Sequence, residues 1–535
     1  MKLNLNSLKD RAVWEAIDVK LPQFDIEKVT ENTKKNPEWV HFGAGNIFRG
    51  FICSLQQELL NKGLAETGII AADTFDYEII DRIFRANDNL TVNVTLNANG
   101  TTDTEIIASV VESLKADCTD EAEMARFVEI FTNPSLKMVS YTITEKGYAV
   151  TDIEGNLTNL VKADIENGPA KARHAMSFVT GLLYERYKAG KYPLAVVSMD
   201  NCSHNGDKIK TAVMTVAKAW AEKGYVDNGF IEYLSDESYI TFPWSMIDKI
   251  TPRPHDSVMA MLEEKGLEDM TPIVTSKNTY IAAFVNAERP QYLVVEDKFP
   301  NSRPCLENAG VYLTDRDTVN KTERMKVTTC LNPLHTALAV YGCLLGYNLI
   351  CEEMKDEELV KLVKRLGYVE GLPVVTDPEI VSPKAFIDEV VNERLPNPFM
   401  PDAPQRIATD TSQKVGIRFG ETIKSYAALG RTDELVAIPL AIAGWARYLL
   451  GIDDNGNVMA VSSDPLLGEL QPKLEGIVVG KPETYNGQLK DILANANIFG
   501  SNLCALGMDT LIEKIFVEEL AGAGAVRATL KKYLR

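Results

Sequence analysis

The stretch VHFGAGNIFRGF, residues 40–51, runs from a short apolar segment through Gly-x-Gly into an amphipathic segment. This order predicts a buried strand, a tight turn and a helix, as in dinucleotide-binding sites. Gly43 would make the turn, and Gly45 would let the backbone approach a pyrophosphate. Asn46 and Ile47 would offer the unpaired N–H groups of a helix N-terminus to the phosphates. The stretch therefore predicts a Rossmann-like dinucleotide site.

The remainder of the usual fingerprint is incomplete. Phe48 occupies the place of its third glycine, so a purely structural turn explains the pattern about equally well. The next strand-like run, residues 68–73, ends in Asp73, 28 residues after Gly45, and a long first helix would account for that spacing. A carboxylate there can bind both adenosine ribose hydroxyls and repel a 2′-phosphate, which predicts NAD. The alternative is that Asp73 only caps the turn between the strand and the following helix.

Apolar runs of four to six residues alternate with amphipathic segments through the first half of the chain, as in a parallel α/β sheet with crossover helices. Residues 90–96 and 104–111, separated by the turn 97–100, predict an inserted β-hairpin instead. The predicted buried strands are residues 39–43, 68–72, 138–143 and 194–199, and the predicted helices between them include residues 51–62 and 121–131.

The pattern becomes mainly helical from about Lys321. The turn-rich stretch 299–304 marks the approach to a domain boundary. We expect a Rossmann-like NAD-binding domain with inserted β elements over residues 1–308 and a mostly helical substrate-binding and catalytic domain over residues 309–535. The predicted helices of the second half are residues 331–347, 357–365, 382–391, 436–450 and 511–520.

Composition excludes several classes of protein. The 535 residues carry a net charge of −19, which disfavours nucleic acid and anionic membranes as partners. No stretch is apolar enough for a membrane span or a signal peptide. Eight scattered cysteines without a CxxC pair fit a reducing cytoplasm, and five histidines without ligand spacing give no argument for a metal.

A chemically coherent triplet lies in residues 326–335, where Lys326 is followed by Asn332 and His335. A lysine shielded from water can take a proton from an alcohol, an asparagine can donate to a developing oxyanion, and a histidine can orient a hydroxyl. Such triplets are common by chance, so spacing alone favours the alternative of a surface lysine, a capping asparagine and a core histidine. Arg406 and Lys414 form a second polar cluster that could hold a carboxylate or a polyol, although a solvated loop is the alternative.

Together these segments resemble the polyol-specific long-chain dehydrogenase/reductase family, which includes mannitol 2-dehydrogenase, fructuronate reductase and tagaturonate reductase. The resemblance spans nearly the whole chain, and its motifs occur in the family's order. They are residues 42–50 (FGAGNIFRG), 142–148 (TITEKGY), 198–201 (SMDN), 247–252 (IDKITP), 326–335 (KVTTCLNPLH), 406–414 (RIATDTSQK) and 497–500 (NIFG).

The resemblance implies a metal-independent reaction with Lys326 as general base. Asn201 and Asn332 would form the oxyanion site, and Glu323 would pass the proton to solvent. The residues implied to contact the sugar chain are His335, Arg406, Lys414 and Asp248.

Departures from the family pattern bear on these roles. Five residues separate Lys326 from Asn332, one more than is usual, so without a backbone bulge Lys326 would be turned about 100° away. Pro333 replaces a small residue, and we expect a helix to begin there. Lys249 replaces an arginine after Asp248, which removes bidentate capacity but keeps the charge.

The leading prediction is an NAD-dependent oxidoreductase that interconverts the keto and secondary alcohol groups of a linear sugar acid, such as D-fructuronate and D-mannonate. The alternatives are a polyol dehydrogenase of the mannitol 2-dehydrogenase type and a non-catalytic NAD- or sugar-binding sensor. We expect a small-molecule substrate, a cytoplasmic location and a monomer or small homo-oligomer.

Overall fold

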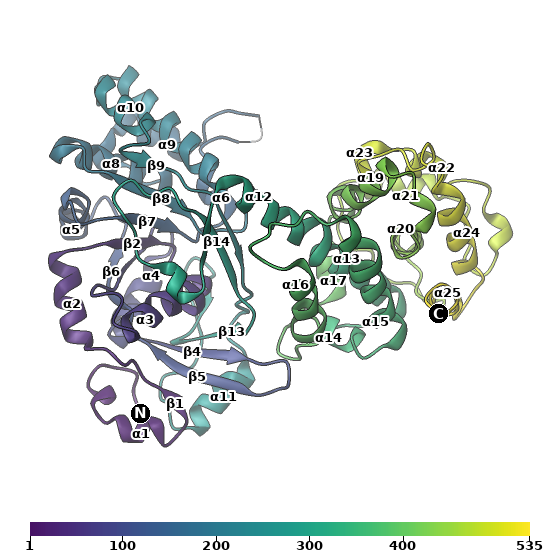
Figure 1. Ribbon diagram of the computed structural model, residues 1–535, viewed down its shortest axis with the longest axis horizontal. Helices are drawn as coiled ribbons and strands as arrows, with labels where there is room; N and C mark the ends of the chain where they lie inside the picture. The colour runs from purple at the N-terminus through teal and green to yellow at the C-terminus, as the bar shows by residue number, and fades with distance from the viewer. Residues whose placement is uncertain (153) are drawn as a thin grey trace. The chain divides into compact units, whose positions relative to one another are not determined.

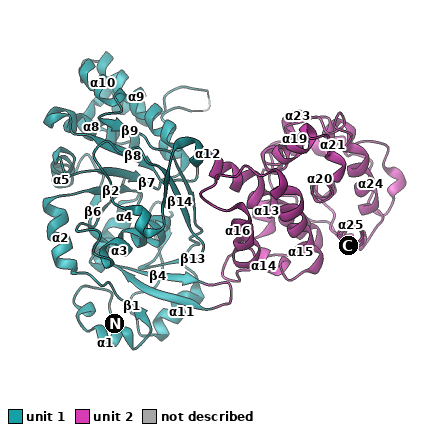
Figure 2. Cartoon of the chain, in the orientation of Figure 1, with its two compact units in different colours: residues 1–96, 101–320 teal, residues 97–100, 321–535 magenta. Residues whose placement is uncertain are grey.

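The computed structural model describes residues 1–152 and 154–535. The chain forms two compact units, one of residues 1–96 and 101–320 and the other of residues 97–100 and 321–535 (Figure 2). The predicted domain boundary lies between residues 308 and 309, and the units divide between Asn320 and Lys321.

A six-stranded parallel sheet forms the centre of unit 1 (Figure 1). All of its strand pairs are parallel, and strands one to six of this sheet lie in the order 3-2-1-4-5-6, which is the Rossmann order. The predicted α/β fold is confirmed. From edge to edge the strands are β6 (Val110–Lys115), β3 (Ile69–Asp73), β2 (Trp39–Phe42), β7 (Met138–Tyr141), β8 (Leu194–Ser198) and β9 (Ile240–Thr241).

Both faces of this sheet are buried, which explains why the central strands β2, β3, β7 and β8 are mainly apolar runs in the sequence. Val40 and Phe42 pack into a core cluster with side chains of α5 (Glu121–Thr132) and α8 (Ala175–Gly190). Trp39, on the same strand, belongs to the cluster on the opposite face. The helices of that second cluster include a π-helical segment, Phe48–Ile52, and α3 (Cys53–Asn61), and α9 (Asn205–Glu222) packs on the first face.

The predicted hairpin is confirmed for β4 (Thr91–Leu96) and β5 (Thr102–Ile107), which pair in antiparallel fashion. The predicted second arm, residues 104–111, was wrong at its end, because Val110 and Val111 begin β6 of the six-stranded parallel sheet. The sheet that contains β4 and β5 was not predicted. In it, β1 (Val19–Lys20) pairs with β5, and β13 (Phe284–Glu288) pairs with β4. A third sheet contains β10 (Ser245–Asp248), β14 (Tyr292–Glu296) and β15 (Tyr312–Thr314).

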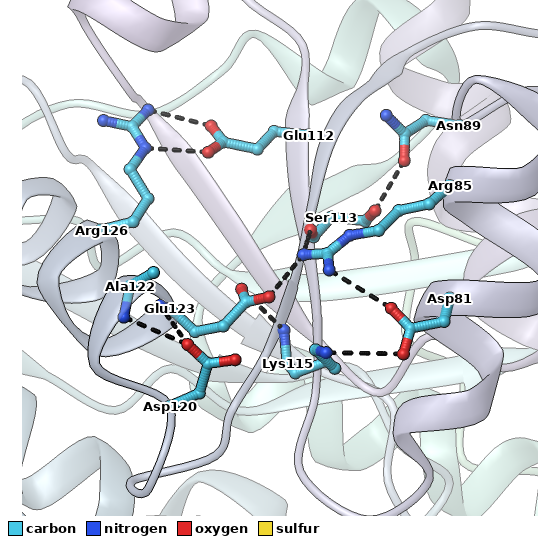
Figure 3. A network of polar contacts seen from close by, with 10 residues as sticks. All are labelled: Asp81, Arg85, Asn89, Glu112, Ser113, Lys115, Asp120, Ala122, Glu123 and Arg126. Atoms are coloured by element: carbon cyan, nitrogen blue, oxygen red, sulfur yellow. Dashed lines mark hydrogen bonds and ion pairs between the residues drawn. The ribbon is translucent and has the colours of Figure 1, made fainter.

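The edge strand β6 is held to its neighbours by a network of charged side chains (Figure 3). Arg126 of α5 donates two hydrogen bonds, of 2.8 and 2.9 Å, to the Glu112 carboxylate on β6. Arg85 donates to Glu123 of α5 at 2.6 Å and to the Ser113 carbonyl at 2.8 Å. The paired carboxylates and arginines thus attach the crossover helix to an edge that would otherwise be exposed.

Unit 2 is helical, as predicted. The structure begins α13 at Asn332 with Pro333 in its first turn, where a proline needs no N–H partner. Among residues 1–152 and 154–535, no helix has the length and apolar character needed to cross a membrane. The main helices are α12 (Arg316–Met325), whose last turns begin unit 2, α13 (Asn332–Leu345), α15 (Glu357–Lys364), α16 (Pro383–Glu389), α19 (Gly420–Ala428), α20 (Ala437–Tyr448), α24 (Asp509–Glu519) and α25 (Ala525–Tyr533).

Candidate active site

Gly43 directly follows β2, at the point where the order of the parallel strands reverses between β2 and β7. Its φ of +100° is strained for other residues, and a Cβ added there would lie 2.2 Å from the Thr142 carbonyl oxygen. Only glycine therefore fits at this position. Ligands of doubly wound sheets bind in the crevice at such a reversal, beyond the carboxyl ends of the strands.

The backbone after Gly43 is open to a ligand. A Cβ added at Gly45 would meet no atom within 4 Å. The first turn of the following helix contains Asn46 and Ile47, both half-buried, whose N–H groups precede the first intrahelical hydrogen bonds. The buried Asn46 Oδ1 has no hydrogen-bond partner among the described residues, so it remains available as an acceptor. These features fit the pyrophosphate and the hydroxyls of a dinucleotide.

His41 supports the turn from beneath. Its Nδ1 lies 2.6 Å from Ser140 Oγ and its Nε2 lies 2.8 Å from Thr142 Oγ1, while its ring stacks on Phe48 at 4.1 Å. Burial lowers the pKa of His41 well below its usual value, so the ring is neutral. The residue that replaces the third fingerprint glycine is thus part of the packing under the turn.

Asp73 ends β3 and is 7% exposed. Its Oδ2 accepts the N–H of Ala44 at 3.0 Å, and its Oδ1 accepts those of Phe75 and Asp76 at 2.8 and 2.7 Å. Burial raises the pKa of Asp73, and the three backbone hydrogen bonds oppose that shift. A carboxylate has about four acceptor positions, so three of them hold the two turns in place and about one remains for a ligand hydroxyl.

Asn201 follows β8 and is exposed. The preceding residue, Asp200, accepts the N–H of Ile143 at 2.7 Å and the hydroxyl proton of Tyr148. Asp200 therefore joins two of the motif segments, 142–148 and 198–201, although their sequences gave it no role. Burial raises the pKa of Asp200 to about 7, against the lowering effect of its Tyr148 and Ile143 hydrogen bonds.

Asp248 ends β10 and is buried. The neighbouring Lys249 donates from Nζ to the Glu288 carbonyl and to Gln291 Oε1, the latter at 3.0 Å, and lies over the Phe51 ring. The lysine that replaces the family arginine is therefore engaged with β13 and with the loop that follows it.

Lys326 lies in unit 2 at the start of a π-helical segment, Lys326–Cys330, that continues α12. The Leu331 N–H donates to the Lys326 carbonyl at 3.1 Å, a hydrogen bond that spans five residues where an α-helix spans four. The turn thereby takes in one additional residue, which is the bulge that the long spacing to Asn332 requires. Lys326 is 3% exposed, and Glu323 lies one turn earlier on α12.

Asn332 and His335 lie three residues apart in the first turn of α13, so their side chains are neighbours on the helix surface. His335 Nε2 is 3.7 Å from Asp402 Oδ2. Burial lowers the pKa of His335 to about 4. The Asp402 carboxylate opposes this shift, and the nearby positive charges of three arginines add to it; these are Arg418, Arg406 and Arg394.

The two predicted cations of unit 2 have protein partners. Arg406 forms an ion pair with Asp402, one helical turn earlier, and its side chain is 67% exposed. Lys414 donates to the Thr409 carbonyl, and burial lowers its pKa. Arg418, which the sequence analysis missed, donates to Thr336 Oγ1, and burial lowers its pKa to about 10. It lacks any local signal, because its position near His335 depends on how separate helices pack.

The described part of the chain contains no group of three or more histidine, cysteine or acidic side chains placed to hold a metal ion. Its eight cysteines are all free thiols.

Comparisons with known proteins agree over both units. Residues 37–308 match the mannitol dehydrogenase Rossmann domain, and residues 318–515 match the mannitol dehydrogenase C-terminal domain. The D-mannonate oxidoreductase of Thermotoga maritima is 52% identical over 99% of this chain and 99% of its own length. The polyol:NADP oxidoreductase of Gluconobacter oxydans is 30% identical over 88% of this chain and 90% of its own length.

Solved structures show the same architecture. The ternary complex of Pseudomonas fluorescens mannitol 2-dehydrogenase with NAD and D-mannitol has a TM-score of 0.69 and 25% identity, covering 100% of this chain and 99% of that one. A substrate-free D-sorbitol dehydrogenase has a TM-score of 0.74 and 26% identity, covering 94% of this chain and 97% of that one. The chain therefore belongs to the mannitol dehydrogenase family of oxidoreductases.

Proposed function

We propose that this oxidoreductase uses NAD to interconvert a linear sugar acid and its keto form, with D-mannonate and D-fructuronate as the pair. The observation that carries the proposal is the 52% identity to a D-mannonate oxidoreductase over nearly the full length of both chains. The 30% identity to a polyol oxidoreductase is much lower.

The charges of unit 2 support an acidic substrate. The chain as a whole has a net charge of −19, so an anionic substrate needs a local group of cations. Arg394, Arg406 and Arg418 all act on the site of His335. Arginine binds carboxylates through two parallel hydrogen bonds, which a neutral polyol does not offer.

The proposed mechanism assigns one step to each side chain. NAD, when bound at the Gly43–Ile47 turn, supplies the acceptor for the hydride. Lys326, shielded from water, takes the proton of the secondary hydroxyl, and Glu323 passes it toward solvent. Asn332 donates a hydrogen bond to the substrate oxygen as it gains negative charge. The neutral His335 orients a hydroxyl. Asn201 and Asp248, both of unit 1, keep the oxyanion and sugar-contact roles that the family resemblance implies.

The sensor hypothesis depended on the long spacing between Lys326 and Asn332. The π turn takes up the additional residue, so the spacing no longer argues against a base at Lys326. A cytoplasmic location and a monomeric or small homo-oligomeric state remain proposals.

We expect the enzyme to prefer NAD to NADP and the Asp73→Ser variant to lose most of that preference. The change removes the negative charge that would repel a 2′-phosphate, and we expect the ratio of kcat/KM for the two cofactors to shift by about tenfold or more. The measurement is kcat/KM with each cofactor. If the ratio were unchanged in Asp73→Ser but shifted in Asp76→Ser, Asp76 would be the residue that selects the cofactor. The Asp76 Oδ1 is buried without a hydrogen-bond partner among the described residues.

We expect Arg406→Ala to raise KM for D-fructuronate by about 10–150-fold, because one charge-assisted hydrogen bond to the carboxylate is lost. Lys414→Ala should act in the same direction. The KM for D-fructose, which has no carboxylate, should rise much less. Arg406→Lys keeps the charge and removes the planar fork, so it separates bidentate binding from simple attraction.

The matched control for this experiment is Arg431→Ala, since Arg431 is an exposed arginine of unit 2 in a similar local ion pair, with Glu434. It should leave both KM values unchanged. If the Arg406 and Lys414 variants affected D-fructuronate and D-fructose equally, the preferred substrate would become a neutral polyol, as in the mannitol 2-dehydrogenases.

A further inference from the structure

A polar cavity of about 460 Å³ lies within unit 1, between α3 and the sheet formed by β1, β5, β4 and β13. Helix faces that pack on sheets are normally apolar. Here the face of α3 toward the sheet presents side chains at helical spacing that are all polar: Ser54, Gln57, Glu58 and Asn61. The space between helix and sheet is consequently hollow and hydrophilic.

The sheet contributes a matching polar row. Lys20 of β1 lies opposite Glu105 of β5, and Glu105 lies opposite Asn93 of β4. Residues directly opposite one another on adjacent strands point to the same face, so the three side chains lie side by side. All three line the cavity.

The row contains an acceptor that the protein does not satisfy. Asn93 is 4% exposed, and its Nδ2 donates to Glu105 Oε1 at 3.0 Å and to Ser54 Oγ at 3.3 Å. Its Oδ1 is buried and has no hydrogen-bond partner among the described residues. Such an atom destabilises the folded protein unless a ligand or water donates to it. Burial also raises the pKa of Glu105, against the hydrogen bond from Asn93 and the charges of Lys20 and Lys249.

The lining charges balance and so define the class of ligand. Three cations, Lys20, Lys249 and Arg289, face three acids, and every lining residue except Gly50 has a polar or charged side chain. No apolar side chain lines the cavity, and a charged ligand gains no net attraction. A volume of about 460 Å³ lies within the usual range for small-molecule pockets.

We propose that this cavity is a second binding site of the enzyme, for a neutral polyhydroxylated molecule such as a sugar or sugar alcohol. Ligand hydroxyls would donate to Asn93 Oδ1 and Glu105 and accept from Lys20. None of the predicted catalytic, cofactor or sugar-contact residues lines it. Lys249, next to Asp248 in the chain, turns toward Glu288 and Gln291. The site does not depend on the proposed function.

The test is calorimetric titration of the full chain with D-mannitol and with myo-inositol, a cyclic polyol unsuited to a site for linear sugars. We expect Asn93→Leu and Glu105→Leu each to weaken binding of at least one probe by about tenfold or more. The kcat with saturating D-mannonate should not change in either variant. If the unmodified enzyme had no activity toward D-mannonate, only the proposed function would be refuted.

Asn301→Leu is the matched control. Asn301 lies outside the cavity lining, donates from Nδ2 to the Leu136 carbonyl at 2.8 Å and has a buried Oδ1 without a hydrogen-bond partner in the described chain, as in Asn93. This variant should bind the probes normally. No binding of either probe, or binding that both cavity variants leave unchanged, would refute the second site and leave a water-filled cavity. Correctly folded variants are identified by an unchanged circular dichroism spectrum.

Discussion

Replacing Lys326 with alanine should lower kcat for D-mannonate oxidation by about 10²–10⁴-fold, because a general base acts on the proton that leaves in the transition state. Lys326 is almost completely buried, at the start of the π-helical segment, so bulk water does not easily replace it. The affinity for NAD should stay nearly unchanged, since a general base acts on the substrate hydroxyl and the proposed NAD-binding residues are those of the Gly43–Ile47 turn and Asp73. The measurements are steady-state kcat and equilibrium binding of NADH by fluorescence.

Two further variants separate chemistry from packing. Lys326→Met keeps most of the side-chain volume and should lose as much activity as alanine. Lys326→Arg keeps the charge but cannot release a proton near neutral pH, so it should not restore turnover. Near-normal kcat in all three variants would exclude Lys326 as the base, and Glu323 would be the next residue to replace.

The central strands β2, β3, β7 and β8 could be predicted because each is a short apolar run bounded by turn or polar residues. The outer strands could not, since β6 contains polar residues and began inside the predicted hairpin, and β9 has only two residues. Gly43 could be assigned to the turn because it directly follows the apolar run of β2. A Cβ added at Gly43 would lie 2.2 Å from the Thr142 carbonyl oxygen, which explains why no side chain fits there. The strands Val19–Lys20 and Phe284–Glu288 could not be placed. The strands with which they pair lie far away in the chain, and Val19–Lys20, with two residues, is too short to show a periodic pattern.

The candidate site could be predicted only where its members are close in sequence. Lys326, Asn332 and His335 occupy successive turns of one helical region, so their spacing identified them. Asp402 and Arg418 are brought near His335 by packing between helices, which no local pattern encodes. The five residues between Lys326 and Asn332 required a bulge. Only the structure shows that this bulge is a π turn over Lys326–Cys330.

Replacing Arg186 with methionine should lower the free energy of unfolding by about 3–5 kcal/mol or more, the largest change in stability that we expect. The side chain is fully buried in α8, and burial lowers its pKa to about 10. It donates five hydrogen bonds of 2.6–3.0 Å to backbone carbonyls at the ends of neighbouring segments. The carbonyls are those of Phe131, Asn133, Leu136, Tyr192 and Pro193.

The reason for so large an effect is that methionine fills the space but supplies no donors, so buried carbonyls in the loops before β7 and β8 lose their partners together. Arg186→Lys should recover only part of the stability, because an ammonium has three donors and cannot span the five positions of the guanidinium fork.

Arg82→Met is the control. Arg82 pairs with Glu78 at the surface, where such pairs contribute about 1 kcal/mol or less. Chemical denaturation followed by intrinsic fluorescence measures all three variants. A loss in Arg186→Met no greater than in Arg82→Met would mean that water reaches these carbonyls, and that the loops are held by the apolar core around α8 instead.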